Sequence, residues 1–287
     1  MQVPPHDSTL LDSTMEERVP RHWDPRPGNP WHSILFWIPA FVFFFVYPLR
    51  GILWAFLAPR SFREGAPGMI RFWGRTLLWM FGVRVEEHQR EFLEWPGAKI
   101  VLFNHVSILD LFLLAAHWPK QATVLYKAEF HRIPFVGRAM RLLDFIPVDL
   151  SSPEKARASV AEAAARIRER GATVLMSPEG TRSPSGGVQP FKMGAFHMAI
   201  QTRAPVVPMI MRGIHDLMPH GSYVARKGAV RIDYLAPVDT RAWRTEDVHR
   251  HAAEIRKQFL NYLPAAPSAA PEECTPPLEA SQPGHAV

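Results

Sequence analysis

The chain has 287 residues, of which 47% are hydrophobic and 21% charged, a composition that excludes an intrinsically disordered chain and a polytopic membrane protein. Its 33 lysines and arginines exceed the 27 acidic residues. The resulting net charge of +6 favours an anionic partner, which can be nucleic acid, a lipid headgroup or a phosphorylated metabolite. The single cysteine, Cys274, excludes an internal disulfide and a cysteine-based zinc site.

Both ends of the chain are predicted to be disordered tails. Residues 1–30 hold six prolines, five acids and three arginines without apolar periodicity, and residues 264–287 hold six prolines and three glutamates. The two tails carry −2 and −3 of the net charge of +6, which leaves +11 on residues 31–263. The part of the chain between the tails is therefore strongly basic.

A hydrophobic, helical membrane anchor is predicted at residues 31–60. Residues 31–49 contain no Asp, Glu, Lys or Arg, and a second apolar piece follows Arg50. A 19-residue helix is almost long enough to cross the roughly 30 Å hydrocarbon core of a bilayer. Because Pro39 and Pro48 argue against one straight helix, we expect either a kinked span or two short helices lying in one leaflet, with a buried core helix as the alternative. The anchor is followed by four arginines that predict the cytoplasmic face of a membrane, the inner membrane if the chain is bacterial: Arg60, Arg63, Arg71 and Arg75.

Residues 61–263 are predicted to form one α/β domain, with a mostly parallel sheet flanked by helices. Short apolar runs predict strands at 99–103, 122–126, 145–148, 173–176, 206–211 and 229–235. Helical patterns lie between them, near 107–117, 135–142, 153–170, 191–202 and 245–262. Ser151 or Ser152 caps the helix at 153–170, and Gly171 ends it. Ligands of such sheets bind at the carboxyl ends of the strands.

A histidine and an aspartate in HxxxxD spacing follow the first of these strands, within the segment NHVSILD. Ser107 is a good helix N-cap, which puts Asp110 at the third helical position, where its carboxylate can reach back to His105. Such a contact would fix the imidazole tautomer and leave the other ring nitrogen free as a general base. The alternative is that Asp110 only caps the helix and His105 is a surface residue. We predict no metal site, since two ligands do not complete a coordination sphere.

Cationic side chains follow two other strands. Lys127 comes directly after the strand at 122–126, and the segment SPEGTRS, residues 177–183, follows the strand at 173–176. Pro178 and Gly180 predict a tight turn there, and Arg182 offers a guanidinium that matches phosphate oxygens. A solvated lysine and a Glu179–Arg182 ion pair are the simpler alternatives. The sequence contains no GxGxxG, GxxxxGK[ST] or GxSxG motif, so we expect a base without a covalent nucleophile, acting on a phosphorylated substrate at a membrane.

Together, these segments resemble the glycerophospholipid acyltransferase family, most closely the 1-acyl-glycerol-3-phosphate acyltransferases. NHVSILD resembles the NHxxxxD motif of that family, and KAEFHRIPFVG resembles its KxELxxxPxxG block. SPEGTRS resembles the PEGTRS block, and FKMGAF and APVVPM resemble the FKxGAF and PVVPV segments. The segments occur in the order of the family, and the resemblance covers roughly residues 69–240.

The resemblance implies a membrane-bound enzyme of phospholipid biosynthesis. It would move a fatty acyl group from acyl-CoA or acyl-carrier protein to the sn-2 hydroxyl of lysophosphatidate, giving phosphatidate, without a cofactor or an acyl-enzyme. By position, His105 would deprotonate the hydroxyl and Asp110 would orient the imidazole. The residues implied to bind the substrate and its phosphate are Asn104, Lys127, Glu179, Gly180, Thr181 and Arg182. The implied partners are membrane lipids, a lysophospholipid and the acyl donor.

Three positions depart from the pattern of the family. Asp144 and Leu150 stand where the second block usually has a Gly and an Arg, and Ser177 replaces an aromatic residue before PEGTRS. An acyltransferase acting on another lysolipid, such as a lyso-ornithine lipid or another lysophospholipid, therefore stays open. A thioesterase in which His105 activates water and a non-catalytic binder of anionic lipid are more remote alternatives. Nucleic acid is not a predicted partner, because the sequence has no zinc-finger, RNP-like or basic-zipper pattern.

Overall fold

The computed structural model describes residues 30–119, 121–133, 136–149, 151–222 and 225–266. Of the predicted tails at 1–30 and 264–287, only Pro30 and residues 264–266 are described. Cys274 and Leu150 also lie outside the described residues. Val188 N donates to Pro264 O at 2.8 Å, and Ala266 N donates to Val188 O at 3.0 Å. The folded domain therefore extends past the boundary predicted at residue 264.

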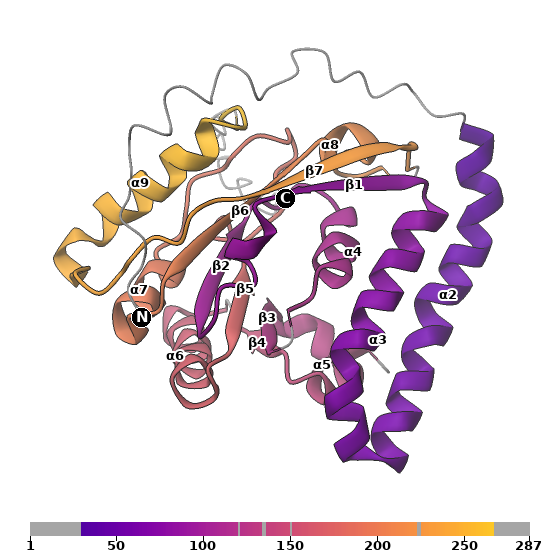
Figure 1. The fold of residues 1–287 in the computed structure, drawn as a ribbon, viewed down its shortest axis with the longest axis horizontal. Coiled ribbons are helices and arrows are strands. Elements are labelled where there is room, and N and C mark those ends of the chain that lie inside the picture. Colours follow the sequence, from indigo (N-terminus) through magenta and orange to yellow (C-terminus); the bar gives the residue numbers. More distant parts are fainter. Residues whose placement is uncertain (1–29, 120, 134–135, 150, 223–224, 267–287) are drawn as a thin grey trace, which may run out of the picture.

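Helices and strands alternate along most of the described chain (Figure 1). The helices are α2 (Pro30–Leu57), α3 (Pro59–Met80), α4 (Leu109–Ala116), α5 (Val136–Leu142), α6 (Pro153–Arg170), α7 (Gly194–Thr202), α8 (Ile214–Leu217) and α9 (Val248–Leu260). The strands are β1 (Val83–His88), β2 (Lys99–Phe103), β3 (Ala122–Lys127), β4 (Ile146–Val148), β5 (Thr173–Met176), β6 (Val206–Arg212) and β7 (Gly228–Tyr234). Each predicted strand is found within one residue of its expected bounds.

The strands form one sheet in the order β1-β7-β6-β2-β5-β3-β4. From β6 to β4 every pair is parallel, whereas β7 runs antiparallel to β6 and parallel to β1. The predicted, mostly parallel sheet is thus confirmed, with β1 and β7 as an edge pair of opposite direction. Because β2, β3 and β5 are mutually parallel, their carboxyl ends lie at one edge, and this edge is where the site is expected.

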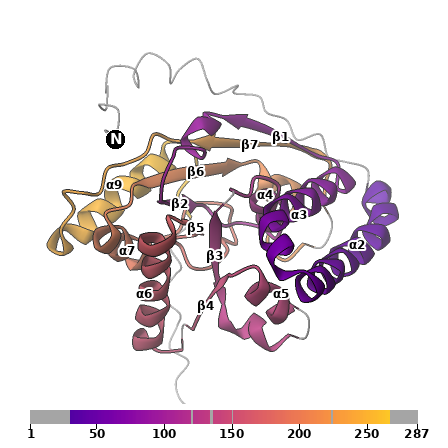
Figure 2. The ribbon, with the colours of Figure 1, turned by 60° about the horizontal axis from the view of Figure 1, so that its bottom comes forward.

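Helices cover both faces of the sheet (Figure 2). Alternate side chains of β2 point to opposite faces, so Ile100 and Leu102 join one core cluster while Val101 and Phe103 join the other. The first cluster is completed by side chains of α6, α7 and α9, and the second by side chains of α3 and α4. All of β2 is buried, as expected of a central parallel strand.

Helix α6 begins and ends where its capping residues predict. Ser152 Oγ accepts a hydrogen bond from Lys155 N at 3.3 Å, and Pro153 occupies the first helical position. Gly171 takes the left-handed conformation, with φ of 64°, and closes the helix by donating from its backbone N to Ile167 O.

The hydrophobic N-terminal segment is one continuous helix, α2, rather than two short ones. It runs through Pro39 and Pro48 without interruption. Among the described helices, α2 alone is long and apolar enough, over Leu35–Leu57, to cross a membrane. One side of it carries a row of exposed apolar residues: Leu35, Ile38, Phe41, Val42, Phe45, Val46, Leu49, Leu53, Phe56 and Leu57.

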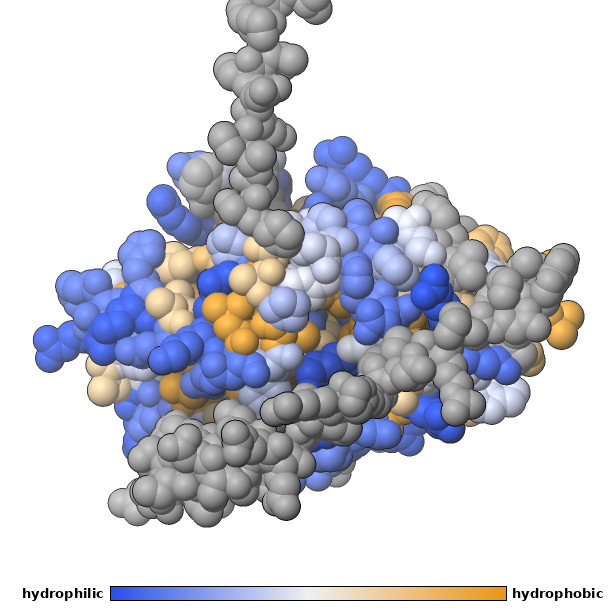
Figure 3. Space-filling model, turned by 90° about the horizontal axis from the view of Figure 1, so that it is seen from above, coloured by the Kyte–Doolittle hydropathy of each residue, from blue (hydrophilic) through white to orange (hydrophobic). Residues whose placement is uncertain are grey.

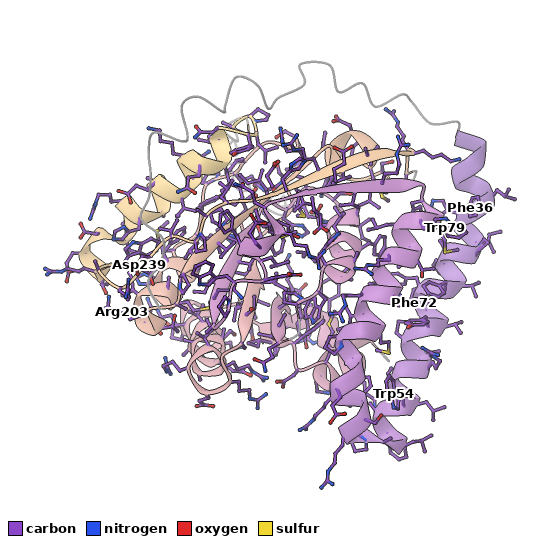
Figure 4. The ribbon with its side chains drawn as sticks, viewed as in Figure 1. Phe36, Trp54, Phe72, Trp79, Arg203 and Asp239 are labelled. Atoms are coloured by element: carbon purple, nitrogen blue, oxygen red, sulfur yellow. The ribbon has the colours of Figure 1, made fainter. Side chains whose placement is uncertain are left out.

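The other side of α2 packs along α3, a helix that the sequence reading did not predict. Phe36 meets Trp79 at one end of the pair, with ring centroids 6.4 Å apart, and Trp54 lies at the other end (Figure 4). Helix α3 in turn packs closely on α4 through Gly74, where an added Cβ would lie 2.4 Å from the Ala116 backbone nitrogen. Helix α3 therefore joins α2 to the face of the sheet that α4 covers.

Candidate active site

His105 and Asp110 form a hydrogen-bonded pair at the carboxyl end of β2. His105 Nδ1 lies 2.7 Å from Asp110 Oδ2. A carboxylate can only accept, so Nδ1 carries the proton and Nε2 is left with a free lone pair. The Asp110 side chain is fully buried, whereas that of His105 is 33% exposed. A buried carboxylate thus holds an accessible imidazole, an arrangement that suits a general base.

Asp110 also binds the backbone of the segment that precedes its helix. Its Oδ2 accepts from Val106 N at 2.7 Å and from Ser107 N at 2.9 Å, while Leu109 N donates to Ser107 Oγ at 3.3 Å. The carboxylate reaches back to Ser107 N as predicted, but Ser107 is not the N-cap: Ile108 holds that position without a side-chain cap, and Asp110 is the second helical residue rather than the third. The same carboxylate therefore binds the backbone before the helix and contacts His105.

Ser107 is not arranged as a nucleophile. It is 1% exposed, and its hydroxyl donates to Met218 O at 2.8 Å while accepting from Leu109 N. Among the residues that the structure describes, no three His, Cys, Asp or Glu side chains gather as metal ligands. The expectation that the reaction needs neither a metal nor a cofactor stays a prediction.

The PEGTRS loop holds the backbone of His105 from both sides. Glu179 Oε1 accepts from His105 N at 3.2 Å and Glu179 Oε2 accepts from Gln189 N at 3.1 Å, while Ser183 N donates to His105 O at 2.7 Å. Burial of Glu179 raises the pKa of its carboxyl to about 7, and the two backbone hydrogen bonds act in the opposite direction. Glu179 therefore supports the histidine directly, and within the described chain it makes no ion pair with Arg182.

Asn104 is used differently from its predicted role in substrate binding. Its side chain is 1% exposed, and its amide nitrogen donates to Met211 O at 2.8 Å while its amide oxygen accepts from Met211 N at 2.8 Å. Both polar atoms are thus taken up by a backbone partner beside β2. The amide ties the end of β2 to β6 and keeps the segment before His105 in place.

The predicted phosphate-binding residues lie at the same edge of the sheet as His105. Lys127 ends β3, and Arg182 follows the adjacent parallel strand β5, with both side chains exposed. Gly180 has φ of 73°, a conformation that favours glycine, and Thr181 next to it is exposed. Their roles in phosphate binding stay predictions.

The departure at Asp144 has a structural explanation. This residue has φ of 62°, in the left-handed region where glycine is favoured and aspartate is among the better-tolerated substitutes. Its carboxylate pairs with Arg166 and Arg170 of α6, and its backbone oxygen accepts from Thr123 Oγ1 at 2.9 Å. Asp144 therefore keeps the turn that a glycine would make and adds contacts to α6.

Comparison with known proteins places the chain in a family. The profile described as Acyltransferase matches residues 84–212. A 1-acyl-sn-glycerol-3-phosphate acyltransferase of Limnanthes alba is 31% identical over 193 residues, which are 67% of this chain and 68% of that protein. The chain belongs to the 1-acyl-sn-glycerol-3-phosphate acyltransferase family. A relative of the same name from Cocos nucifera is 31% identical over 191 residues, which are 67% of this chain and 61% of the coconut protein.

A solved structure shares the fold of this acyltransferase. The crystal structure of the 1-acyl-sn-glycerophosphate acyltransferase PlsC from Thermotoga maritima matches with a TM-score of 0.68 and 25% sequence identity. The match covers 80% of this chain and 93% of the Thermotoga maritima chain. The likeness confirms the fold class predicted from the sequence, a mostly parallel α/β sheet with flanking helices.

Residues outside the matched profile also support the site of the acyltransferase. Arg256 of α9 donates through Nε to Gln189 O at 3.0 Å and through Nη2 to Val188 O at 3.1 Å. Gln189 N in turn holds Glu179, which holds His105 N. Sequence reasoning missed Arg256 because an arginine on an amphipathic helix, far along the chain, carries no motif that links it to the site.

Proposed function

We propose that this chain transfers a fatty acyl group from an acyl thioester to the sn-2 hydroxyl of lysophosphatidate, giving phosphatidate. The observation that carries the proposal is the 2.7 Å hydrogen bond between His105 Nδ1 and the buried Asp110 Oδ2. Membership of the 1-acyl-sn-glycerol-3-phosphate acyltransferase family adds the substrate class, since the curated relatives bear that name.

In the proposed reaction, His105 Nε2 takes the proton of the lysophosphatidate hydroxyl as its oxygen attacks the thioester carbonyl. The new C–O bond forms a tetrahedral intermediate, whose collapse breaks the C–S bond. The departing thiolate takes the proton back from the imidazolium, so His105 ends the cycle neutral. Asp110 favours this path because its charge stabilises the imidazolium. A covalent acyl-enzyme is not required, in keeping with the hydrogen-bonded state of Ser107.

The phosphate of the acceptor would lie beside Lys127 and Arg182. Both cations are exposed at the carboxyl ends of neighbouring strands, and a phosphate monoester carries about −1.5 to −2 charges near neutral pH. The guanidinium can bind two phosphate oxygens at once, whereas the lysine acts as a point charge. Holding the phosphate would fix the distance from the headgroup to the reacting hydroxyl.

The proposal is tested by the release of free thiol from acyl-CoA in the presence of lysophosphatidate, with the full-length protein in detergent. We expect His105→Ala to abolish release, while His249→Ala, which alters an exposed histidine on α9, keeps the wild-type rate. Release that is equally fast without lysophosphatidate would identify a thioesterase instead. Lipid binding without any turnover would identify a binding protein.

Parallel reactions define the substrates. Acyl-CoA and acyl-carrier protein are compared as donors with lysophosphatidate as the common acceptor. A set of lysolipids that includes lyso-ornithine lipid is then compared with the preferred donor, and the products are identified by mass spectrometry. Preferred acylation of a lysolipid without a phosphate monoester would refute the assignment of lysophosphatidate while leaving the acyl transfer intact.

We further propose that α2 lies along one leaflet, on the cytoplasmic face, rather than crossing the membrane. Its packed side contacts α3 from Phe36–Trp79 at one end to Trp54 and Gly65 at the other. If α2 crossed the membrane, α3 would enter the hydrocarbon core with it, because the two helices are packed together. The exposed Arg63 of α3 would then lie in hydrocarbon, at a cost of about 3 kcal/mol. Ten large apolar side chains of α2 are exposed. Figure 3 shows hydrophobic atoms at the right-hand edge of a face that is mostly hydrophilic apart from a hydrophobic patch near its centre.

This arrangement is tested by the sidedness of the two ends of α2. Trp31→Cys, near the start of α2, and Arg60→Cys, just past its end in the first turn of α3, are introduced one at a time in a Cys274→Ser background. Both should react with a membrane-impermeant maleimide from the cytoplasmic side of sealed vesicles. Reaction from opposite sides would show that the helix crosses the bilayer.

A further inference from the structure

Lys192 lies across the turn that displays the predicted phosphate ligands. Its backbone N donates to Pro178 O at 2.7 Å, and the preceding Phe191 is buried in the core. A Cβ added to Gly180 would lie 2.8 Å from Lys192 Nζ and 3.0 Å from Lys192 Cε. The distal half of the lysine therefore rests against Gly180, one residue from Thr181.

The ammonium of Lys192 makes no hydrogen bond or ion pair with the residues that the structure describes, although the side chain is held against a turn. Lys155, by comparison, reaches Asp149 Oδ2 at 3.1 Å. Glu179, which belongs to the turn itself, directs its carboxylate to the backbone of His105 and Gln189. The ammonium of Lys192 is thus available for an external anion.

Gly180 makes room for the lysine. Its φ of 73° already favours glycine, and any side chain there would also occupy the space of the Lys192 stem. Three donor groups therefore lie at this turn: the hydroxyl of Thr181, the guanidinium of Arg182 and the ammonium of Lys192. Such a grouping of donors suits a phosphate group, whose oxygens accept several charge-assisted hydrogen bonds.

We propose that Lys192 binds a phosphate group of a substrate and completes an anion-binding pocket with Thr181 and Arg182. The inference rests on the proposed acyl transfer, in which both substrates carry phosphate. The phosphate can be the monoester of lysophosphatidate or one of the phosphates of CoA, and the ammonium serves either in the same way. The role belongs to substrate binding and not to the proton transfer at His105.

The test removes the charge while keeping the length of the side chain. Dissociation constants of lysophosphatidate and of CoA are measured separately for the full-length wild type, Lys192→Met and the control Lys257→Met, which alters an exposed lysine of α9. KM for each substrate is then measured with the other saturating. Loss of one charge-assisted hydrogen bond should weaken one of the two ligands by about 10- to 100-fold. The ligand that weakens identifies the source of the phosphate.

The outcomes separate this inference from the proposed function. If the wild type binds both ligands but transfers no acyl group, the proposed function fails, while the binding constants still decide the role of Lys192. Unchanged dissociation constants and KM values in Lys192→Met would overturn the inference. A lower kcat at unchanged KM would also overturn it, since a binding residue must affect affinity.

Discussion

Glu179 is expected to make the stability of the protein depend on pH. It is 2% exposed, and burial raises the pKa of its carboxyl from 4.5 to about 7, against the effect of its two backbone hydrogen bonds. In the unfolded chain the pKa returns to 4.5, so between pH 4.5 and pH 7 the folded state holds a proton that the unfolded state has lost. The stabilisation by the protonated form is complete below pH 4.5 and is lost as the pH rises through 7. At about 1.4 kcal/mol per pH unit, the loss amounts to about 3 kcal/mol.

The assay is urea unfolding of the full-length protein in detergent, followed by tryptophan fluorescence between pH 5 and pH 8. Glu179→Gln removes the titrating group, so the free energy of unfolding of the wild type should fall relative to the variant by about 2.5 kcal/mol over this range. Burial lowers the pKa of His117, which makes stability rise with pH in the same window, but His117 is present in both proteins and cancels. A difference that stays constant from pH 5 to pH 8 would refute the reasoning.

Three further changes test the geometry of the site and of its support. Asp110→Asn should lower kcat by about 10²- to 10⁴-fold at little-changed KM, because the uncharged amide no longer stabilises the His105 imidazolium. An unchanged kcat in steady-state kinetics would contradict this role of Asp110. Gly74→Ala should reduce the free energy of unfolding by about 1–3 kcal/mol, because its Cβ would meet Ala116 N, and an unchanged urea midpoint would show that α3 can shift. Arg256→Ala should speed amide hydrogen exchange in the loop at 188–189 and lower kcat, with partial recovery in Arg256→Lys. Exchange at the wild-type rate would show that the hydrogen bonds of Arg256 do not hold this loop.

Local patterns were sufficient to predict most elements of the α/β domain. The strand at 99–103 is a short run that is apolar after Lys99, which suits a strand buried on both faces, and α6 has a serine cap at one end and a glycine at the other. Helix α3 was missed although Phe62, Ile70 and Leu77 recur at helical spacing and form its buried face. Its arginines were assigned only to a membrane face, and the helical periodicity of the segment was overlooked. Strand β1 was missed because half of its residues are charged, as an edge strand allows.

The site was predictable as far as its parts are near one another in the chain. His105 and Asp110 are five residues apart, so the local turn before α4 brings their side chains together, and the sequence by itself was sufficient to predict this pair. The contact between Glu179 and His105 N joins residues 74 positions apart and depends on β2 and β5 being parallel neighbours. The tertiary structure alone could decide that Glu179 supports the histidine, that Asn104 is bonded to Met211, and that a lysine crosses Gly180. Hydrogen bonds of a few ångströms between distant segments are set by the pairing of strands, and no local pattern specifies that pairing.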